Sequence, residues 1–183
     1  MSVAEYLAGE RDSDVRHEYV DGQVYAMAGA SDRHNRIALN IASRPNEHLV
    51  NDECEAFVSD MKIKVEEALY YYPDVVVTCD PPGGDAYFRT QPRLIVEVTS
   101  PSTERVDRHE KLHAYRRIES LQEYVLVSQD APPIEVHRCG AHVEWSREVL
   151  TEPLEQLALA SVGLTLSLSD VSRNVRFDEA GET

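Results

Sequence analysis

The chain has 183 residues, of which 42% are hydrophobic and 28% are charged, which is enough apolar sequence for a globular domain with a core of its own. No apolar run is long enough to cross a membrane, and residues 1–9 lack the basic start of a secretory signal, so neither a membrane protein nor a secreted one is expected. The formal net charge of −15 also argues against tight non-specific binding to polyanions such as nucleic acids.

The number and spacing of the cysteines predict the redox state of the cellular compartment. Cys54, Cys79 and Cys139 are widely spaced and odd in number, and they form no CxxC pair. Such spacing is typical of neither a disulfide framework nor a zinc knuckle. We therefore expect buried thiols in a reducing, cytoplasmic environment.

The first elements are a helix and a hairpin. Residues 2–8 predict a short helix, and the alternating residues 16–27 turn at Asp21-Gly22, which is a strong two-residue hairpin signal. Glu18 stands just before that turn. Its carboxylate would belong either to a functional site or to the surface of the hairpin.

A second helix and a strand follow. Ser31 can cap a helix that carries His34, and Pro45 is expected to end or kink it. Residues 55–65 then predict one strand, with Lys62 inside it.

Two short apolar runs, residues 70–77 and 93–99, each contain one carboxylate. Both are rich in β-branched residues and bounded by turn residues, so they predict strands buried on two faces. The Pro-Gly segment 81–84 must form a loop between them, most simply with the strands antiparallel. Asp74 opens the apolar part of the first run and Glu97 closes that of the second, so this pairing brings both acids to one end of the sheet. Buried acids need a counter-charge or a metal.

The next segment supplies a cation. Ser102 or Thr103 can cap a helix whose apolar periodicity runs to about Ile118. Lys111 projects into the apolar arc of this helix. An inward lysine beside two converging acids indicates a functional site, whereas a lone one would more simply cover apolar surface with its stem.

The remaining elements complete the fold prediction. Residues 124–127 predict a strand, residues 134–138 and 142–150 a hairpin across Gly140, and residues 164–168 a short strand or helical turn. We expect one α/β domain over residues 1–183, with a central mixed sheet flanked by helices and additional hairpins. Its polar end, residues 174–183, is expected to be loosely ordered.

Pro73-Asp74 followed by Glu97-Val98-Thr99 resembles the PD-(D/E)XK nuclease superfamily. A wider ordered set of segments resembles one bacterial branch, the Uma-type restriction endonucleases, over about residues 6–171. This set comprises His17–Gly22, Ser31–His34, Tyr72–Val77, Val96–Thr103, Asp107–Lys111, Tyr115 and Glu123–Val127. The superfamily pattern has a lysine at the position of Thr99, and in this branch the lysine has moved to the following helix, where Lys111 projects inward.

The resemblance implies a restriction-endonuclease-like fold and hydrolysis of phosphodiester bonds in DNA. It implies that Asp74, Glu97 and the backbone carbonyl of Val98 hold Mg²⁺, for which Mn²⁺ can substitute, and that Lys111 assists the reaction. It also implies a homodimer, so that two sites address two strands.

Four further residues have open roles. The resemblance places Glu18 near the metal and gives His34 a contact with phosphate or with an acid, although a structural histidine fits as well. Tyr115 could position Lys111 or contact the nucleic-acid backbone, or simply belong to the core. Lys62 is the rival for the catalytic lysine.

Two other functions stay open. A non-catalytic binding or scaffold protein with a nuclease fold agrees with the acidic charge. The segment His109–His113 matches HExxH, the zinc-protease signature. Both of its histidines fall on the polar side of the predicted helix, however, and only His137 and His142 follow downstream, so a solvated histidine pair is the simpler interpretation.

Overall fold

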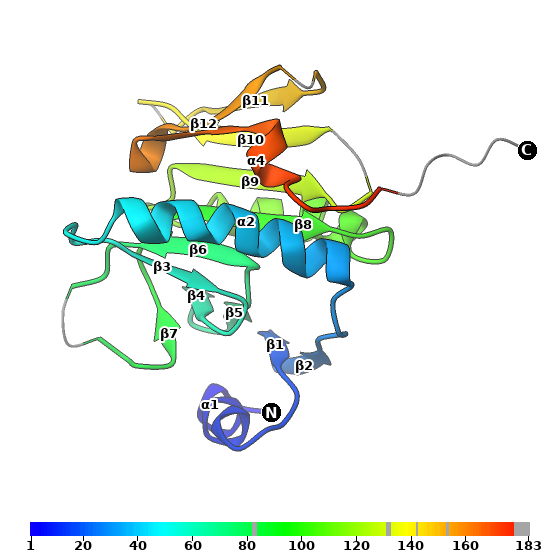
Figure 1. Ribbon diagram of the computed structural model, residues 1–183. Coiled ribbons are helices and arrows are strands. Elements are labelled where there is room, and N and C mark those ends of the chain that lie inside the picture. Colours follow the sequence, from blue (N-terminus) through cyan, green and yellow to red (C-terminus); the bar gives the residue numbers. More distant parts are fainter. Residues whose placement is uncertain (82–83, 131–132, 142, 153, 178–183) are drawn as a thin grey trace, which may run out of the picture.

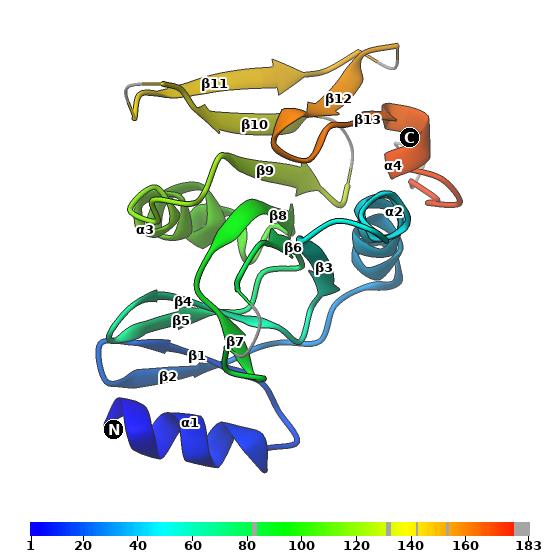
Figure 2. The same cartoon turned by 90° about the vertical axis from the view of Figure 1, so that its left-hand side faces the viewer.

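The computed structural model describes residues 1–81, 84–130, 133–141, 143–152 and 154–177. The chain forms a six-stranded sheet with a helix on each face, and a five-stranded sheet lies beside it (Figures 1 and 2). Within the described ranges, no helix is long and apolar enough to cross a membrane. The predictions that involve Pro82, Gly83 and His142 fall outside these ranges, as does segment 178–183 of the predicted tail.

The larger sheet is the predicted central mixed sheet. Its order is β11-β10-β9-β8-β6-β3, in which β8 and β9 run parallel and all other neighbours run antiparallel. Its strands are β3 (Glu55–Val58), β6 (Val75–Thr78), β8 (Pro92–Thr99), β9 (Glu123–Ser128), β10 (Ile134–Cys139) and β11 (Trp145–Leu150). The antiparallel pairing of β6 with β8 and the β10–β11 hairpin confirm the predictions for these segments.

The second sheet has the order β2-β1-β5-β4-β7. Its strands are β1 (His17–Val20), β2 (Gln23–Ala26), β4 (Lys62–Glu66), β5 (Leu69–Tyr71) and β7 (Phe88–Arg89). The predicted turn at Asp21-Gly22 is confirmed, since both residues have the positive φ (46° and 90°) that a tight hairpin turn requires.

Two predicted strands are wrong in extent because each is divided between the two sheets. Residues 55–65 split into β3 and β4 at Ser59, whose φ of 59° turns the chain. Residues 70–77 split into β5 and β6 around Pro73, which cannot donate to a strand ladder.

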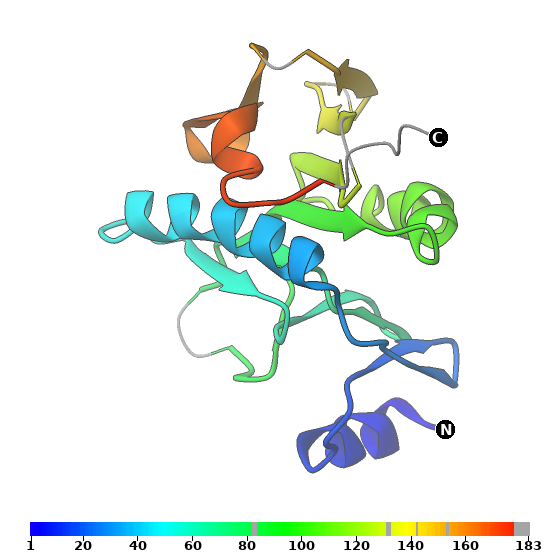
Figure 3. The ribbon, with the colours of Figure 1, turned by 45° about the vertical axis from the view of Figure 1, so that its right-hand side comes forward.

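The helices cover both faces of the larger sheet (Figure 2). Helix α2 (Asp32–His48) packs against β3, β6 and β8. The helical segment η1 (Val106–Lys111) with α3 (Leu112–Tyr115) lies on the opposite face. Helix α1 (Val3–Arg11) covers the second sheet, far from α4 (Leu168–Val171), as Figure 3 shows.

Two helix boundaries differ from the predictions. Pro45 does not end α2, because the helix continues to His48 and the Pro45 carbonyl accepts from Leu49 N–H at 2.9 Å. The later helix ends at Tyr115 instead of Ile118. Its helical residues begin at Glu104, directly after Thr103, so Thr103, one of the two predicted caps, stands at the start of the helix.

The last elements are β12 (Gln156–Leu159), η2 (Ala160–Val162), β13 (Leu164–Ser167) and α4. Both alternatives predicted for residues 164–168 are therefore realised, a strand followed by a helical turn. Buried residues of α2, α4, β12 and β13 form one core on one face of the larger sheet, and those of α3, β4 and β5 form a second core on the other.

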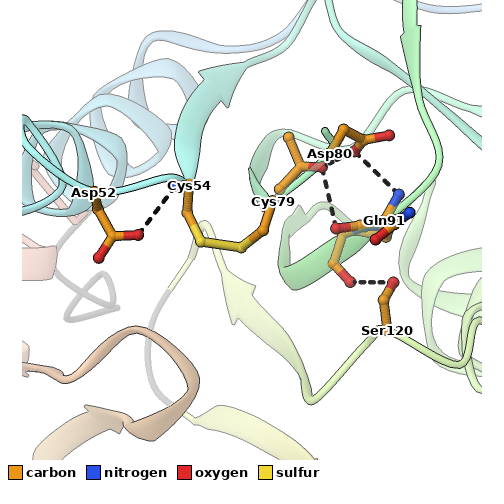
Figure 4. Close-up of a disulfide and its surroundings, with 8 residues drawn as sticks. Asp52, Cys54, Cys79, Asp80, Gln91 and Ser120 are labelled. Atoms are coloured by element: carbon orange, nitrogen blue, oxygen red, sulfur yellow. Dashed lines mark hydrogen bonds between the residues drawn. A yellow bond between two sulfur atoms is a disulfide. The ribbon is translucent and has the colours of Figure 1, made fainter. Parts of the chain in front are cut away.

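A disulfide joins Cys54 and Cys79, so the prediction of three free thiols is wrong (Figure 4). The pairing of Glu55 with Thr78 places the cysteines that flank them opposite each other, with Cα atoms 4.2 Å apart. Their separation of 25 residues gave no sign of this pairing. Cys139 remains free. The inference of a reducing compartment therefore loses its basis in the thiols.

The disulfide should contribute measurably to stability. Cross-links of this loop length typically stabilise a protein by about 2–4 kcal/mol. The double change Cys54→Ser with Cys79→Ser should lower the free energy of unfolding in urea by about that amount, and a reductant should do the same to the wild type. Cys139→Ser is the matched control. Identical unfolding curves with and without reductant would contradict the cross-link.

Candidate functional site

The predicted pair of acids meets at one end of the larger sheet. β6 and β8 pair with Val75 opposite Val96, so the next residues outward, Asp74 and Glu97, face each other. Glu97 is only 3% exposed. Antiparallel pairing thus brings the two carboxylates together, as the sequence predicted.

Pro73 determines what surrounds them. Counting outward from Val75 and Val96, Pro73 would stand opposite Val98. Because proline has no N–H, it cannot donate a ladder hydrogen bond to the Val98 carbonyl. The Val98 N–H donates to the side chain of Asp74 instead, at 2.7 Å from Oδ2. The end of the strand therefore places a backbone carbonyl beside a carboxylate.

In each of the two carboxylates, one oxygen accepts the hydrogen bonds from described residues and the other accepts none. Asp74 Oδ2 accepts a backbone N–H and lies 3.1 Å from His34 Nε2. Glu97 Oε1 accepts from Lys111 Nζ and from the Tyr115 hydroxyl, both at 3.1 Å. No bond between described residues ends on Asp74 Oδ1 or Glu97 Oε2. Hard divalent cations take such oxygens as ligands.

Lys111 points inward, as predicted, and is 7% exposed. Its Nζ lies 3.0 Å from Glu18, 3.1 Å from Glu97 and 3.4 Å from Asp107. Although burial opposes the charge of this ammonium, the surrounding carboxylates, Glu97 first among them, raise its pKa well above the usual value. Lys111 is therefore a charged lysine that joins acids from three elements.

Asp107 is the site residue for which the sequence analysis gave no role. It is 3% exposed, and its pKa is raised by burial against the opposing effect of Lys111. It lies four residues before Lys111 on the same side of η1, so the inward direction predicted for Lys111 could have identified it. η1 is a π-helix, a rare geometry that is frequent at functional sites, and the Tyr124 hydroxyl donates to the Asp107 carbonyl at 3.0 Å.

Two of the supporting candidates reach the cluster. Glu18 extends from β1 to Lys111, so it is not a surface carboxylate. Tyr115 belongs both to the core and to the site, because it is fully buried while its hydroxyl holds Glu97.

His34 lies in the first turn of α2, where its N–H donates to the capping Ser31 at 3.1 Å. Burial opposes protonation of the imidazole, but hydrogen bonding to Asp74, the charge of Asp74 and the backbone of Val98 outweigh this effect and raise the pKa of His34. The other ring nitrogen, Nδ1, is buried without a hydrogen-bond partner. Among the open roles, the structure supports the one in which His34 orients an acid.

Lys62 does not join the carboxylates. Its Nζ donates to the Tyr72 hydroxyl at 3.1 Å, and that hydroxyl donates to Glu10 at 3.0 Å. Burial lowers the pKa of this lysine. The structure therefore separates the two candidate lysines and places only Lys111 at the site.

The HExxH segment does not form a metal site. His109 and His113 are exposed, and His137 is buried against Glu135 at 2.6 Å. Within the described part of the chain, no three His, Cys, Asp or Glu side chains form a metal-binding group, either at this segment or around Asp74 and Glu97. This arrangement gives no support to a zinc protease.

The charge of the cluster suits a further cation. Four carboxyl groups, those of Glu18, Asp74, Glu97 and Asp107, face one ammonium and one imidazole. Negative charge in excess at a mostly buried site is costly unless a cation balances it. The donors beside it are carboxylate oxygens and a carbonyl, which fit Mg²⁺ or Mn²⁺ better than softer metals.

Comparison with known proteins identifies the family. The model of the family Uma2, described as "Putative restriction endonuclease", matches residues 3–169. The chain belongs to the Uma2 family.

Two relatives of this Uma2 chain come from the cyanobacterium Synechocystis. The protein named slr1290 is 37% identical over 180 residues, which cover 97% of this chain and 94% of the relative. The protein named sll1609 is 34% identical over 156 residues, which cover 83% and 86%. Both carry the name "Uncharacterized protein".

A crystal structure supports the fold. A "putative nuclease belonging to DUF820" from Anabaena variabilis superposes with a TM-score of 0.73 over 93% of this chain and 97% of that protein. At 20% identity this likeness concerns the fold, and it confirms the restriction-endonuclease-like architecture predicted from the sequence.

The buried acids should make the stability of this Uma2 protein depend on pH. Burial, together with the charges of Asp107 and Asp74, raises the pKa of Glu97 despite Lys111. The folded state then holds the proton more tightly than the unfolded state, so stability present at low pH is lost as pH rises above the ordinary carboxyl value. The slope is at most about 1.4 kcal/mol per pH unit for each proton.

Urea unfolding in EDTA between about pH 5 and pH 8 would measure this dependence. Glu97→Gln should flatten it, whereas Glu119→Gln, which alters an exposed carboxylate, should not. A wild-type stability that rises through this range in parallel with that of Glu97→Gln would contradict the raised pKa.

Proposed function

We propose that this protein is a metal-dependent endonuclease that hydrolyses phosphodiester bonds in DNA. The observation that supports the proposal is the meeting of Asp74, Glu97 and the Val98 carbonyl at one end of the sheet, with Lys111 beside them. Membership of the Uma2 family is consistent with this chemistry.

Asp74 Oδ1, Glu97 Oε2 and the Val98 carbonyl would hold Mg²⁺, or Mn²⁺ in its place. When bound, the ion would offset charge on the phosphate and lower the pKa of a water molecule. Hydrogen bonds to the other oxygen of each carboxylate keep the two acids in place. His34 and the Val98 N–H hold Asp74, and Tyr115 holds Glu97.

Lys111 would act on the substrate. Its ammonium can donate to the scissile phosphate or orient the attacking water, and both contacts strengthen as charge develops in the transition state. Asp107 and Glu18 keep the ammonium beside Glu97. Thr99 stands where the superfamily pattern has its lysine. It lies two residues after Glu97 on the same side of β8, so a lysine at position 99 could reach the region beside Glu97 that Lys111 occupies.

The substrate and its location are part of the proposal. DNA in the cytoplasm fits an endonuclease that acts as a homodimer on two strands. With a net charge of −15, attraction to DNA must come from local basic residues, which concentrate between Arg105 and Arg117, in and directly after the helix that carries Lys111. Binding should therefore be strongest at low salt.

A non-catalytic binding protein with the same fold is the second candidate. The net charge of −15 favours it, because DNA-binding proteins usually carry a basic surface. Against it, the buried Asp74, Glu97 and Lys111 set costs desolvation energy, and an inactive descendant has no evident use for it.

The metal ligands can be tested by calorimetry with Mg²⁺ and Mn²⁺. Asp74→Asn and Glu97→Gln each remove a charged ligand, so each should weaken binding at least about tenfold, or about 1.4 kcal/mol. Asp60→Asn, which changes an exposed carboxylate, is the matched control. Unchanged affinity in both site variants would remove the metal site from the proposal.

The role of Lys111 can be separated from metal binding. Lys111→Met keeps the apolar stem and removes the charge, so cleavage of supercoiled plasmid at low salt should fall by about 100-fold or more. Metal affinity should stay within a few-fold of wild type because no ligand is lost. Lys62→Met, at an equally buried lysine outside the cluster, should retain activity.

A relocation experiment makes this test sharper. Adding Thr99→Lys to Lys111→Ala should restore part of the cleavage, because the new ammonium would extend from the strand that carries Glu97. If Lys62→Met abolished cleavage while Lys111→Met retained it, the assignment of the catalytic lysine would be wrong. Metal binding without any cleavage by the wild type would favour the second candidate.

A further inference from the structure

The outer strand of the second sheet has no neighbour on one side. β2 ends the order β2-β1-β5-β4-β7, and within the described ranges no strand pairs with its outer edge. All four of its residues are exposed, with Val24 at 41% and Tyr25 at 55%. Open strand edges are usually protected by charge, proline or a bulge, because they otherwise pair with another chain.

β2 lacks such protection. The other edge strands of the six-stranded and five-stranded sheets carry charged residues: Glu55 in β3, Arg89 in β7, and Arg147 with Glu148 in β11. β2 reads Gln-Val-Tyr-Ala, and the whole stretch of residues 22–31 has no charged side chain. In a chain of net charge −15, two copies repel each other least where such an exposed uncharged stretch meets its equivalent.

The alternation of hydrogen-bonded pairs between β1 and β2 shows which backbone groups of β2 point away from β1. Met27 N–H donates to the Arg16 carbonyl at 2.8 Å, so alternation makes Glu18 and Tyr25 a hydrogen-bonded pair as well. Val24 and Ala26 therefore direct their N–H and C=O groups away from β1.

We propose that two copies of this chain pair through β2, antiparallel about a two-fold axis at Tyr25. Val24 of each copy then pairs with Ala26 of the other, which satisfies the open groups of both residues. Tyr25 stands opposite its own equivalent in the close, non-hydrogen-bonded position, where aromatic side chains contact each other. A C₂ interface of this kind is self-complementary, since one strand supplies both halves.

The pairing joins the two five-stranded sheets into one sheet of ten strands. Because the axis is perpendicular to the sheet, both copies present the same face. The two β1 strands lie three strand spacings apart, about 14 Å. Each β1 carries a Glu18 that contacts Lys111, so both candidate sites open on one side of the dimer. The homodimer itself and the placement of its sites rest on the proposed function, whereas the assignment of the interface to β2 does not.

The first test is the mass of the particle in solution. Light scattering of the full chain should give twice the chain mass of 20.6 kDa across micromolar concentrations. Val24→Pro removes only an outward N–H and leaves the β1 ladder intact, so it should abolish the dimer, whereas Val24→Ala should keep it. A wild type that is monomeric throughout would overturn the proposal.

The second test does not depend on how well Val24→Pro folds. In a Cys139→Ser background, Tyr25→Cys should give a covalent dimer on mild oxidation, because residue 25 faces itself at a separation that suits a disulfide. Val149→Cys, a partly exposed position on the edge strand β11, should not. A dimer that survives Val24→Pro and shows no cross-link in Tyr25→Cys has its interface elsewhere, which refutes the proposal. Neither readout involves cleavage, so a failed nuclease assay leaves the inference standing.

Discussion

The buried ammonium of Lys111 is the interaction on which the site depends. It holds Glu18 from β1, Glu97 from β8 and Asp107 from its own helix. Without it, these acids would face one another in a largely dry environment, where their mutual repulsion would be costly. Because these acids come from different elements, the Lys111 ammonium also connects the β1–β2 hairpin to the larger sheet and to the helix that carries Lys111.

The end of the larger sheet is built on a second constraint, the missing N–H of Pro73. A residue with an amide hydrogen there would extend the ladder and occupy the Val98 carbonyl. Proline ends the ladder, the chain passes from β5 to β6, and the Asp74 side chain takes the Val98 N–H. Termination of a strand and formation of a polar site are thus one event, which gives the Pro-Asp pair of the motif a structural reason.

Local patterns predicted the elements well and their assignment to sheets poorly. The β-branched runs around Asp74 and Glu97 and the Asp21-Gly22 turn all identified real strands. Whether residues 55–65 form one strand or two depends on a single positive φ at Ser59, and serine gives little sequence signal for that conformation. Pro45 was expected to end or kink α2, but the helix continues to His48.

The sequence by itself determined the family, the restriction-endonuclease-like fold, the meeting of Asp74 with Glu97 and the inward direction of Lys111, since each follows from local periodicity or an ordered motif. Only the tertiary structure decided that Glu18 and Asp107 share that lysine, and that Cys54 bonds to a cysteine 25 residues away. The physical reason is that such contacts join elements whose separation in the chain carries no periodic signal. Their partners are fixed by strand register and by the packing of the helix on the sheet, which a one-dimensional pattern does not contain.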